Sequence, residues 1–158
     1  MNFFLKLFKL LPPELSHSFS LKSLNILYKL KILKFLIKRP SNDESFDFIG
    51  LRFKNRLGTA AGLDKNGDYI DSLGELGFGF LEVGTITPKP QEGNSKPRVF
   101  RNFKENSIIN RLGFNNKGVD YLVNNLKKRS YEGILGVNIG ANKESKGPER
   151  INDYLICL

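Results

Sequence analysis

Cysteine and histidine are scarce in this sequence, which contains only Cys157 and His17. One cysteine excludes an intramolecular disulfide and any multi-cysteine metal site, and it fits a protein from a reducing compartment. One histidine excludes a histidine-rich metal site. Nothing around these two residues supports a Cys–His catalytic dyad. Any redox chemistry must therefore come from an organic cofactor.

The common nucleotide-binding fingerprints are also missing. No segment has the G-x-x-x-x-G-K-[ST] pattern of a phosphate-binding P-loop. The glycines of residues 77–84, GFGFLEVG, lack the G-x-G-x-x-G spacing of a dinucleotide site, and they lie inside an expected strand. The sequence therefore argues against both nucleotide-binding classes.

Charge is distributed unevenly along the 158 residues, which are enough for one domain with a buried core. The formal net charge is +9, and 40% of the residues are hydrophobic, an ordinary share for a globular protein. Eight basic residues but only one acidic residue, Glu14, lie in residues 1–40. The basic character therefore belongs to an N-terminal arm, residues 1–42, and not to the body, residues 43–158.

The arm mixes leucine, isoleucine and phenylalanine with lysine. It has no run of about 18 apolar residues, so a membrane-spanning helix is not expected. The interrupted apolar region and the missing small-residue cleavage site also argue against a signal peptide. We expect a short helix that ends at Pro12-Pro13, a second helix that begins there, a break near Leu30 and a linker at 39–42.

Two interpretations of the arm remain open. In one, its helices lie on a membrane surface, with apolar side chains at the acyl boundary and lysines among anionic headgroups. In the other, the helices pack on the protein's own body, the lysines are solvated, and His17 is a structural residue. Nucleic-acid binding is disfavoured because apolar residues outnumber the groups that would reach phosphates or bases.

Strand and helix patterns alternate in the body, which predicts parallel βα units. The helices are expected to bury Ile70, Leu73 and Leu76, and then Val119, Leu122, Val123 and Leu126. The expected elements are a hairpin at 46–53 that covers one end of the core, a buried strand at 57–61, a helix at 67–77, a strand at 78–87, a short extra strand at 97–101 within an insertion, a helix at 117–129, a buried strand at 133–140 and a helix from 147.

The three main strands end in small or amide residues, at Ala61-Gly62, Gly84-Thr85 and Asn138 to Gly140. Ligands bind at the carboxyl ends of parallel strands, so these positions are expected to converge on one site. Three βα units suit an open sheet or part of a barrel, but they cannot close the usual eight-stranded barrel. The expected fold class is therefore α/β with an unfinished sheet.

Three motifs contain candidate site residues. Residues 60–65, AAGLDK, offer a small-residue surface to a flat ligand together with the cation of Lys65, although a tight turn with a surface lysine also explains them. Residues 110–116, NRLGFNN, gather amides, a guanidinium and an aromatic ring, or form a polar loop that caps a helix at Asn115 or Asn116. Asn138 is either a hydrogen-bonding residue at a strand end or a turn residue.

Together and in this order, the motifs resemble the dihydroorotate dehydrogenases, specifically the quinone-linked, membrane-associated class. The likeness runs from about residue 10 onward and includes AAGLDKNG, GFGFLEVGTITPKPQEGNSKPRVFR, INRLGFNNKGVD, GILGVNIGANK and DYLICL. It implies the first three βα units of an FMN-containing (β/α)₈ barrel. It also implies oxidation of dihydroorotate to orotate in pyrimidine synthesis, with electron transfer to a membrane quinone. The protein would be peripheral, bound to an anionic membrane surface on the cytoplasmic face of the inner membrane.

The resemblance also assigns roles to individual residues. A lysine ammonium would suit a carboxylate substrate and the negative charge that develops on a reduced flavin. The FMN positions are Ala61, Gly62, Leu63, Asp64, Lys65, Thr85 and Asn138; the substrate positions are Lys65, Asn110, Arg111, Leu112, Gly113 and Phe114; and the quinone passage has His17 and Arg101.

The family's general base, a serine on a loop beyond the third strand, has no counterpart in the sequence and is expected beyond Leu158. The later strands, a second lysine and the loops that hold the FMN phosphate have no counterpart either. We therefore expect a truncated chain that is inactive alone. The alternative is a non-catalytic, membrane-associated binding module, which would expose strand edges that later βα units normally cover.

Overall fold

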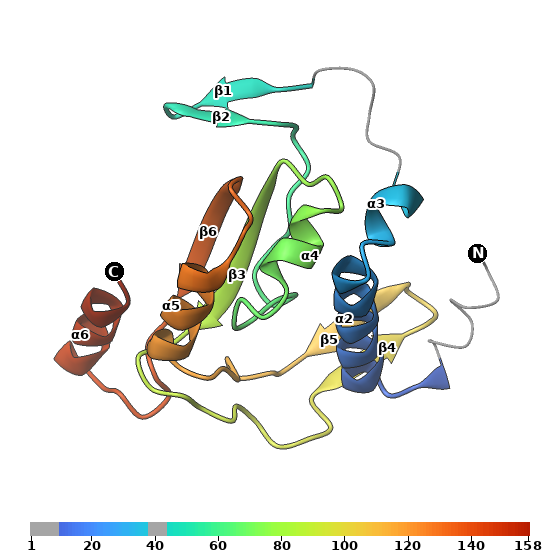
Figure 1. The fold of residues 1–158 in the computed structure, drawn as a ribbon. Coiled ribbons are helices and arrows are strands. Elements are labelled where there is room, and N and C mark those ends of the chain that lie inside the picture. Colours follow the sequence, from blue (N-terminus) through green and yellow to red (C-terminus); the bar gives the residue numbers. More distant parts are fainter. Residues whose placement is uncertain (1–9, 38–43) are drawn as a thin grey trace.

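The computed structural model describes residues 10–37 and 44–158. Figure 1 shows a central pair of parallel strands with helices packed beside it and two separate antiparallel hairpins. The strands of the described residues form two-stranded sheets and no closed barrel. In chain order the elements are α2 (Pro13–Lys29), α3 (Leu33–Leu36), β1 (Phe46–Phe48), β2 (Leu51–Phe53), α4 (Ile70–Gly74), β3 (Phe80–Ile86), β4 (Val99–Asn102), β5 (Ser107–Asn110), α5 (Val119–Lys128), β6 (Ile134–Ile139) and α6 (Pro148–Cys157).

The parallel pairing of β3 with β6 confirms the expected βα organisation. In its register Gly84 lies opposite Asn138, so the two strands end at the same edge. Side chains alternate between the faces of a strand. Leu81 and Val83 of β3 are buried on the helix side, and Glu82 therefore faces the other side.

The strand predicted at 57–61 is wrong, because this segment makes only an isolated parallel bridge between Gly58 and Phe80. Oγ1 of Thr59 accepts the N–H of Glu82 at 3.0 Å, where a regular ladder would use a backbone carbonyl. The N–H of Thr59 still donates to the Phe80 carbonyl at 3.3 Å. The segment therefore runs beside β3 without forming a regular strand.

The helix predicted at 67–77 is also shorter than expected, since α4 has five residues. The carboxylate of Asp64 accepts the backbone N–H groups of Asp68 and Tyr69, at 3.0 and 2.7 Å. Local side-chain acceptors of this kind compete with helix formation. Gly67 has φ +69°, which a right-handed helix does not allow. The residues before α4 therefore form an irregular loop.

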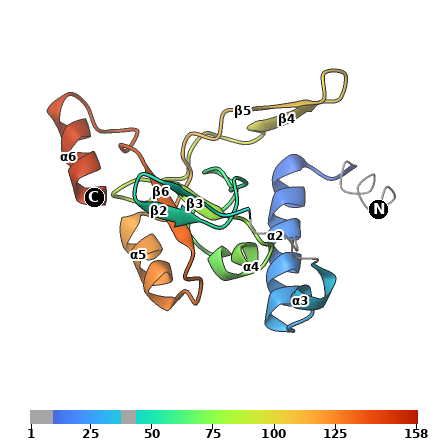
Figure 2. The same ribbon diagram turned by 90° about the horizontal axis from the view of Figure 1, so that it is seen from above.

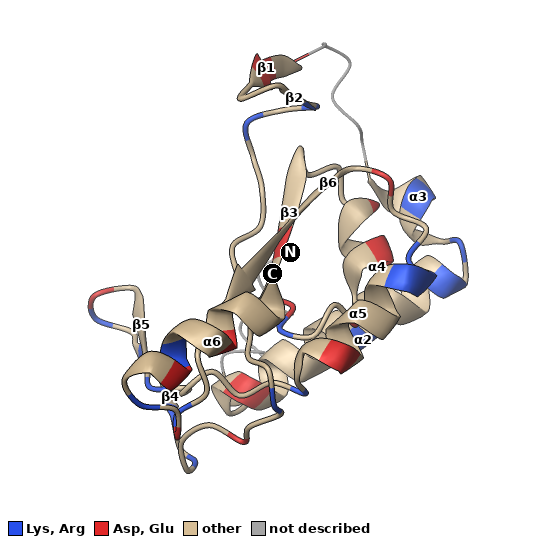
Figure 3. Ribbon diagram, turned by 90° about the vertical axis from the view of Figure 1, so that its left-hand side faces the viewer, with Lys and Arg blue, Asp and Glu red and all other residues tan. Residues whose placement is uncertain are grey.

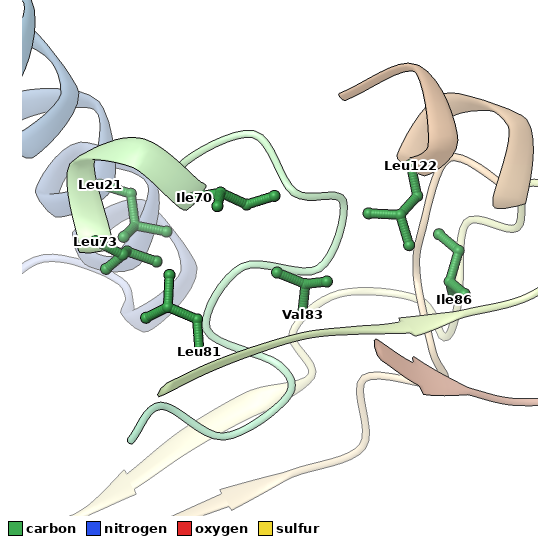
Figure 4. Packing of buried hydrophobic residues seen from close by; sticks show 7 residues of the cluster. All are labelled: Leu21, Ile70, Leu73, Leu81, Val83, Ile86 and Leu122. Atoms are coloured by element: carbon green, nitrogen blue, oxygen red, sulfur yellow. The ribbon is translucent and has the colours of Figure 1, made fainter. Parts of the chain in front are cut away.

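The core lies between the parallel strands and the helices α2, α4 and α5, as Figure 4 shows. It confirms the expected inward positions on α4 and most of those on α5. Val123 was predicted on the inner side and is instead 37% exposed. The buried cluster consists of Leu21, Ile70, Leu73, Leu81, Val83, Ile86 and Leu122.

Strand β6 is present as predicted, but it is not fully buried. Gly136 and Val137 in its middle are exposed. Within the described residues β6 pairs only with β3, so its second edge has no neighbouring strand. An edge strand keeps part of its surface in solvent, which explains the difference.

The second half of the arm agrees with the sequence. Helix α2 begins with Pro13 in its first turn. It ends at Lys29, and Lys31 then adopts a left-handed φ of +58° before α3, so the predicted break near Leu30 is confirmed. Most of the predicted first helix and the linker at 39–42 lie outside the described residues. None of the helices in the described ranges has the length and hydropathy needed to cross a bilayer.

Two hairpins flank this framework. The predicted hairpin at 46–53 is confirmed, and its turn residues Ile49 and Gly50 both have positive φ, as two-residue hairpin turns require. The extra strand predicted at 97–101 exists as β4. Its antiparallel partner β5 was not predicted, although Ile108 and Ile109 are β-branched residues typical of strands.

Replacing Gly84 with alanine should destabilise the chain strongly. A Cβ at this position would lie 2.3 Å from the Asn138 carbonyl oxygen, and the backbone has φ +112°. Strain and overpacking together should lower the free energy of unfolding by about 3 kcal/mol. Urea unfolding followed by circular dichroism measures this loss.

Gly50→Ala is the matched control, because its φ is +74° but no atom lies within 4 Å of the added Cβ. Gly50→Ala should lower the free energy of unfolding by only about 1.5 kcal/mol, from backbone strain alone. Equal losses for the two variants would contradict the close approach of β3 to β6.

Candidate functional site

The ends of β3 and β6 are joined by side-chain hydrogen bonds. Thr85 donates its hydroxyl to Oδ1 of Asn138 at 2.7 Å. Asn138 in turn donates from Nδ2 to Oε1 of Glu82 at 3.3 Å. The side-chain amide of Asn138 is thus held from both ends, which fixes its orientation at the carboxyl edge of the sheet.

The loop of residues 60–65 lies along the same edge. The N–H of Gly62 donates to the Gly84 carbonyl at 2.8 Å, and the N–H of Gly84 donates to the Asp64 carbonyl at 3.0 Å. Gly62 has φ +102°, and a Cβ placed on it would meet no atom within 4 Å. The loop therefore presents open, side-chain-free backbone next to the strand ends.

Asp64 is buried within this loop and holds it together. Its residue is 2% exposed, and its carboxylate accepts the two backbone N–H groups described above. Burial raises the pKa of Asp64 above its ordinary value of 3.8, and the hydrogen bonds oppose that rise. Its contacts are those of a structural residue that shapes the loop.

Lys65 turns back over the loop, and its Nζ donates to the Gly62 carbonyl at 2.9 Å. Burial lowers the pKa of Lys65 below its ordinary 10.5; smaller effects come from Glu14, which raises the pKa, and from Arg98, which lowers it. The ammonium is thus a partly buried cation beside open backbone, where a bound anion would be held strongly.

A cleft of ≈ 630 Å³ extends from this loop to the N-terminal arm. Helix α2, the loop and the β4–β5 hairpin form its walls. It brings together His17, Gly62, Leu63, Asp64, Lys65, Arg101, Asn110 and Leu112, which were predicted in three separate groups. Arg111, Gly113 and Phe114, as well as Ala61, Thr85 and Asn138, do not line this cleft.

The arm is fixed to the cleft by polar contacts at the start of α2. Nε2 of His17 lies 2.7 Å from the Leu63 carbonyl oxygen, which joins α2 to the loop. Arg101 donates to the Leu11 carbonyl at 2.6 Å and to Oγ of Ser16 at 2.9 Å. The two residues predicted for a quinone passage therefore lie on opposite walls of one cleft.

Comparison with known proteins identifies the family of this chain. The sequence profile of dihydroorotate dehydrogenase matches residues 45–158. This chain belongs to the dihydroorotate dehydrogenase family. Dihydroorotate dehydrogenase (quinone) of Buchnera aphidicola subsp. Schizaphis graminum is 54% identical over 153 residues, which are 97% of this chain and 45% of that protein.

Other relatives agree. The enzyme of the same name from Hamiltonella defensa subsp. Acyrthosiphon pisum is 55% identical over 94% of this chain and 44% of its own length. The crystal structure of DHODH from Eimeria tenella in complex with ferulenol has a TM-score of 0.71 at 37% identity, covering 90% of this chain and 40% of that one. The chain thus spans about 45% of the length of the curated relatives described here.

The remaining substrate-loop residues predicted from the family lie on the outer side of the β4–β5 hairpin and after it. Arg111 places its guanidinium 5.8 Å from the Phe100 ring centroid and donates to the Pro97 carbonyl at 3.1 Å. The carbonyl of Gly113 accepts from Gln91 at 3.0 Å. Phe114 is 55% exposed.

Neither Asn115 nor Asn116 is the N-cap of α5, which is Gly118, but Oδ1 of Asn116 accepts the Gly118 N–H at 2.8 Å. Asn116 also exchanges hydrogen bonds with Thr87, through Nδ2 at 2.8 Å and Oδ1 at 3.3 Å. Among the described residues, the buried Oδ1 of Asn115 has no hydrogen-bond partner, and Asn115 lines the cleft.

Sequence reasoning missed an ion pair that involves Glu14, a residue of the cleft wall. Nε and Nη2 of Arg98 donate to Oε1 of Glu14 at 3.0 and 2.9 Å, and the Arg98 side chain is only 8% exposed. Nη1 of Arg98 also donates to the Glu92 and Asn94 carbonyls. Glu14 is the sole acidic residue of the basic arm, a signal that could have indicated a specific basic partner.

Glu82 was also missed, although a carboxylate in an otherwise apolar strand was a usable signal. Glu82 accepts a hydrogen bond from Asn138 and so orients a side chain that is predicted to contact the cofactor. Glu82 itself is not predicted to contact the cofactor.

The lowered pKa of Lys65 predicts a specific pH dependence of stability. Between that lowered pKa and 10.5, the unfolded chain binds more protons at Lys65 than the folded chain. The free energy of unfolding should therefore rise with pH across this window, relative to a variant without the group. Lys65→Met should lose this increment, as measured by urea unfolding at several pH values.

Lys54→Met is the control, because Lys54 is an exposed lysine. The free energy of unfolding of Lys54→Met should change with pH in parallel with that of the unsubstituted chain. A Lys65→Met profile that also runs parallel would contradict a buried Lys65 ammonium.

Proposed function

We propose that this chain contributes the flavin-facing loop, part of the substrate loop and the quinone passage of a dihydroorotate dehydrogenase (quinone). The whole enzyme would be an FMN-containing (β/α)₈ barrel that oxidises dihydroorotate to orotate in pyrimidine biosynthesis and reduces a membrane quinone. The observation that supports this most is the shared cleft, which links Lys65 to His17 and Arg101. An oxidoreductase in which one flavin serves two substrates needs a route to the flavin for each of them.

The residues at the strand ends fit a flat cofactor. The open space over Gly62 would accept a planar ring against the backbone, because a side chain there would fill it. Ala61 and Gly62 would line the ring, and Thr85 and Asn138, held in one orientation, would offer hydrogen bonds at its edge. FMN would supply hydride acceptance and then electron transfer to the quinone.

Lys65 would act as the cationic group of the site. Its ammonium would pair with the substrate carboxylate and stabilise negative charge that develops nearby during oxidation. Its hydrogen bond to Gly62 holds it at the loop, so little reorganisation is needed when an anion binds. The low-dielectric surroundings that lower its pKa also strengthen such an ion pair.

Polar groups that line the same cleft as Lys65 suit a pyrimidine ring. Asn110 lines the cleft and carries amide donors and an acceptor for ring carbonyl and N–H groups. The general base is proposed to be a serine in the part of the enzyme that this chain does not span.

The arm would connect the site to the membrane. Helices α2 and α3 and the residue that follows α2, Leu30, expose large apolar side chains, including Phe19, Ile26 and Phe35, beside several lysines. Figure 3 shows basic positions gathered at α3 and the end of α2. This pattern suits a helix pair lying on an anionic bilayer surface, at the cytoplasmic face of the inner membrane.

A chimera tests the proposed function. The 158 residues are fused to the part of the Buchnera relative that they do not match, and dihydroorotate-dependent quinone reduction is measured. The chimera should bind flavin and turn over, and Lys65→Ala should lower kcat about 100-fold, the typical loss for one transition-state donor.

Lys54→Ala in the same chimera is the control and should keep full activity, since Lys54 is exposed. A flavin-loaded chimera without dihydroorotate oxidation would favour the non-catalytic module. Unchanged kinetics of Lys65→Ala would remove Lys65 from the site.

His17 should affect the quinone half-reaction selectively. In the chimera, His17→Ala should raise the KM for a short-chain, water-soluble quinone about fivefold, the effect of about one lost hydrogen bond. The KM for dihydroorotate should stay within about twofold. Lys22→Ala, an exposed position on α2, is the control. A rise in the KM for dihydroorotate alone would exclude His17 from the quinone passage.

A further inference from the structure

The β4–β5 hairpin exposes apolar side chains that the proposed function does not use. Phe103 lies in its turn and is 61% exposed, and Ile108 on β5 is 67% exposed. In the register of the hairpin, Ile108 is opposite Arg101, and both line the cleft. The hairpin therefore forms one wall of the cleft and ends in an exposed aromatic ring.

The hairpin turn lies on the same side of the molecule as the arm. Figures 1 and 2 both place the turn, the start of α2 and helix α3 on the side away from β6 and α6. Leu10, which precedes α2 in the chain, is 82% exposed, and Phe35 on α3 is 79% exposed. Three segments that are separate in sequence thus lie on one side of the molecule, and each carries an exposed apolar side chain.

A ligand that binds in the cleft must be able to enter between these elements. Its arm wall includes Pro13, His17 and Leu21, and its hairpin wall includes Val99 and Ile108. If the acceptor is a lipid-soluble quinone, it can pass from the bilayer into the cleft without crossing water only when both walls reach the membrane. This step depends on the proposed function.

The charge of this side suits an anionic surface. Lys31 and Lys34 flank the exposed apolar residues of α3, and the turn of the hairpin carries Lys104 beside Glu105. Basic side chains next to exposed aromatic and aliphatic ones favour contact with anionic lipid headgroups.

We propose that the β4–β5 hairpin is a second membrane-contacting element, with Phe103 at the acyl boundary of an anionic phospholipid bilayer beside helices α2 and α3. Both walls of the cleft then contact the membrane, and the cleft opens toward the bilayer between them.

Single-tryptophan variants test this in the 158-residue chain, which contains no tryptophan. Phe103→Trp reports on the hairpin, Phe35→Trp on the arm, and Phe48→Trp on the β1–β2 hairpin, where Phe48 is 57% exposed. Each is mixed with vesicles of phosphatidylglycerol and brominated phosphatidylcholine. Fluorescence of Phe103→Trp and Phe35→Trp should shift to the blue and be quenched, and that of Phe48→Trp should not change.

The other outcomes overturn the proposal in distinguishable ways. Quenching of Phe35→Trp without Phe103→Trp would leave the arm on the membrane and remove the hairpin from it. No quenching of either would refute membrane contact by the arm as well, and quenching of all three would indicate unspecific adsorption. A concentration-dependent blue shift of Phe103→Trp without vesicles would assign the hairpin to a protein interface instead.

A second measurement uses partitioning. Phe103→Asp should bind the same vesicles about tenfold more weakly than the unsubstituted chain, the effect of withholding much of one phenylalanine side chain from an apolar phase. Phe48→Asp should bind within about twofold. Both positions are exposed, so neither change removes core packing. Equal partitioning of the two variants would overturn the proposal.

Discussion

The parallel pairing of β3 with β6 is the constraint on which the candidate site depends. It places Gly84 opposite Asn138 and so brings two strand ends to one edge. The same register leaves no room for a side chain at Gly84, because the Asn138 carbonyl lies in that space. The loop that carries Lys65 reaches this edge through two backbone hydrogen bonds to Gly84. One close approach of two strands thus positions groups from three segments.

The arm is attached to this framework by a few strong polar contacts rather than by a large apolar interface at its start. The buried guanidinium of Arg98 pairs with Glu14, and His17 contacts the loop carbonyl of Leu63. A buried charge that loses its partner is costly, so these contacts hold the start of α2 in one place. The cleft between the arm and the body therefore has a defined shape, as a passage for a second substrate would need.

Elements with regular apolar periodicity were predictable from the sequence, and those shaped by side-chain hydrogen bonds were not. The central strands, α5 and the break after Lys29 follow from pattern and turn residues. The segment at 57–61 and the start of α4 differ because Thr59 and Asp64 bind backbone N–H groups that a regular strand or helix would use. Propensity and periodicity do not contain such local competition.

The residues of the candidate site also fall into those that the sequence could suggest and those that it could not. The small and amide residues after apolar runs selected Thr85 and Asn138 as candidates, and the family motifs selected Lys65; their roles stay predictions. Contacts between distant segments, such as Glu14 with Arg98, depend on how the arm folds back, and only the structure shows them.

The most direct test of the central claim is a nuclear Overhauser measurement between the Asn138 side-chain amide and the Thr85 methyl group. The account predicts a cross-peak, together with a shift of that amide signal when Thr85 is replaced by valine. The absence of both would show that the two strand ends do not meet and would contradict the proposed site.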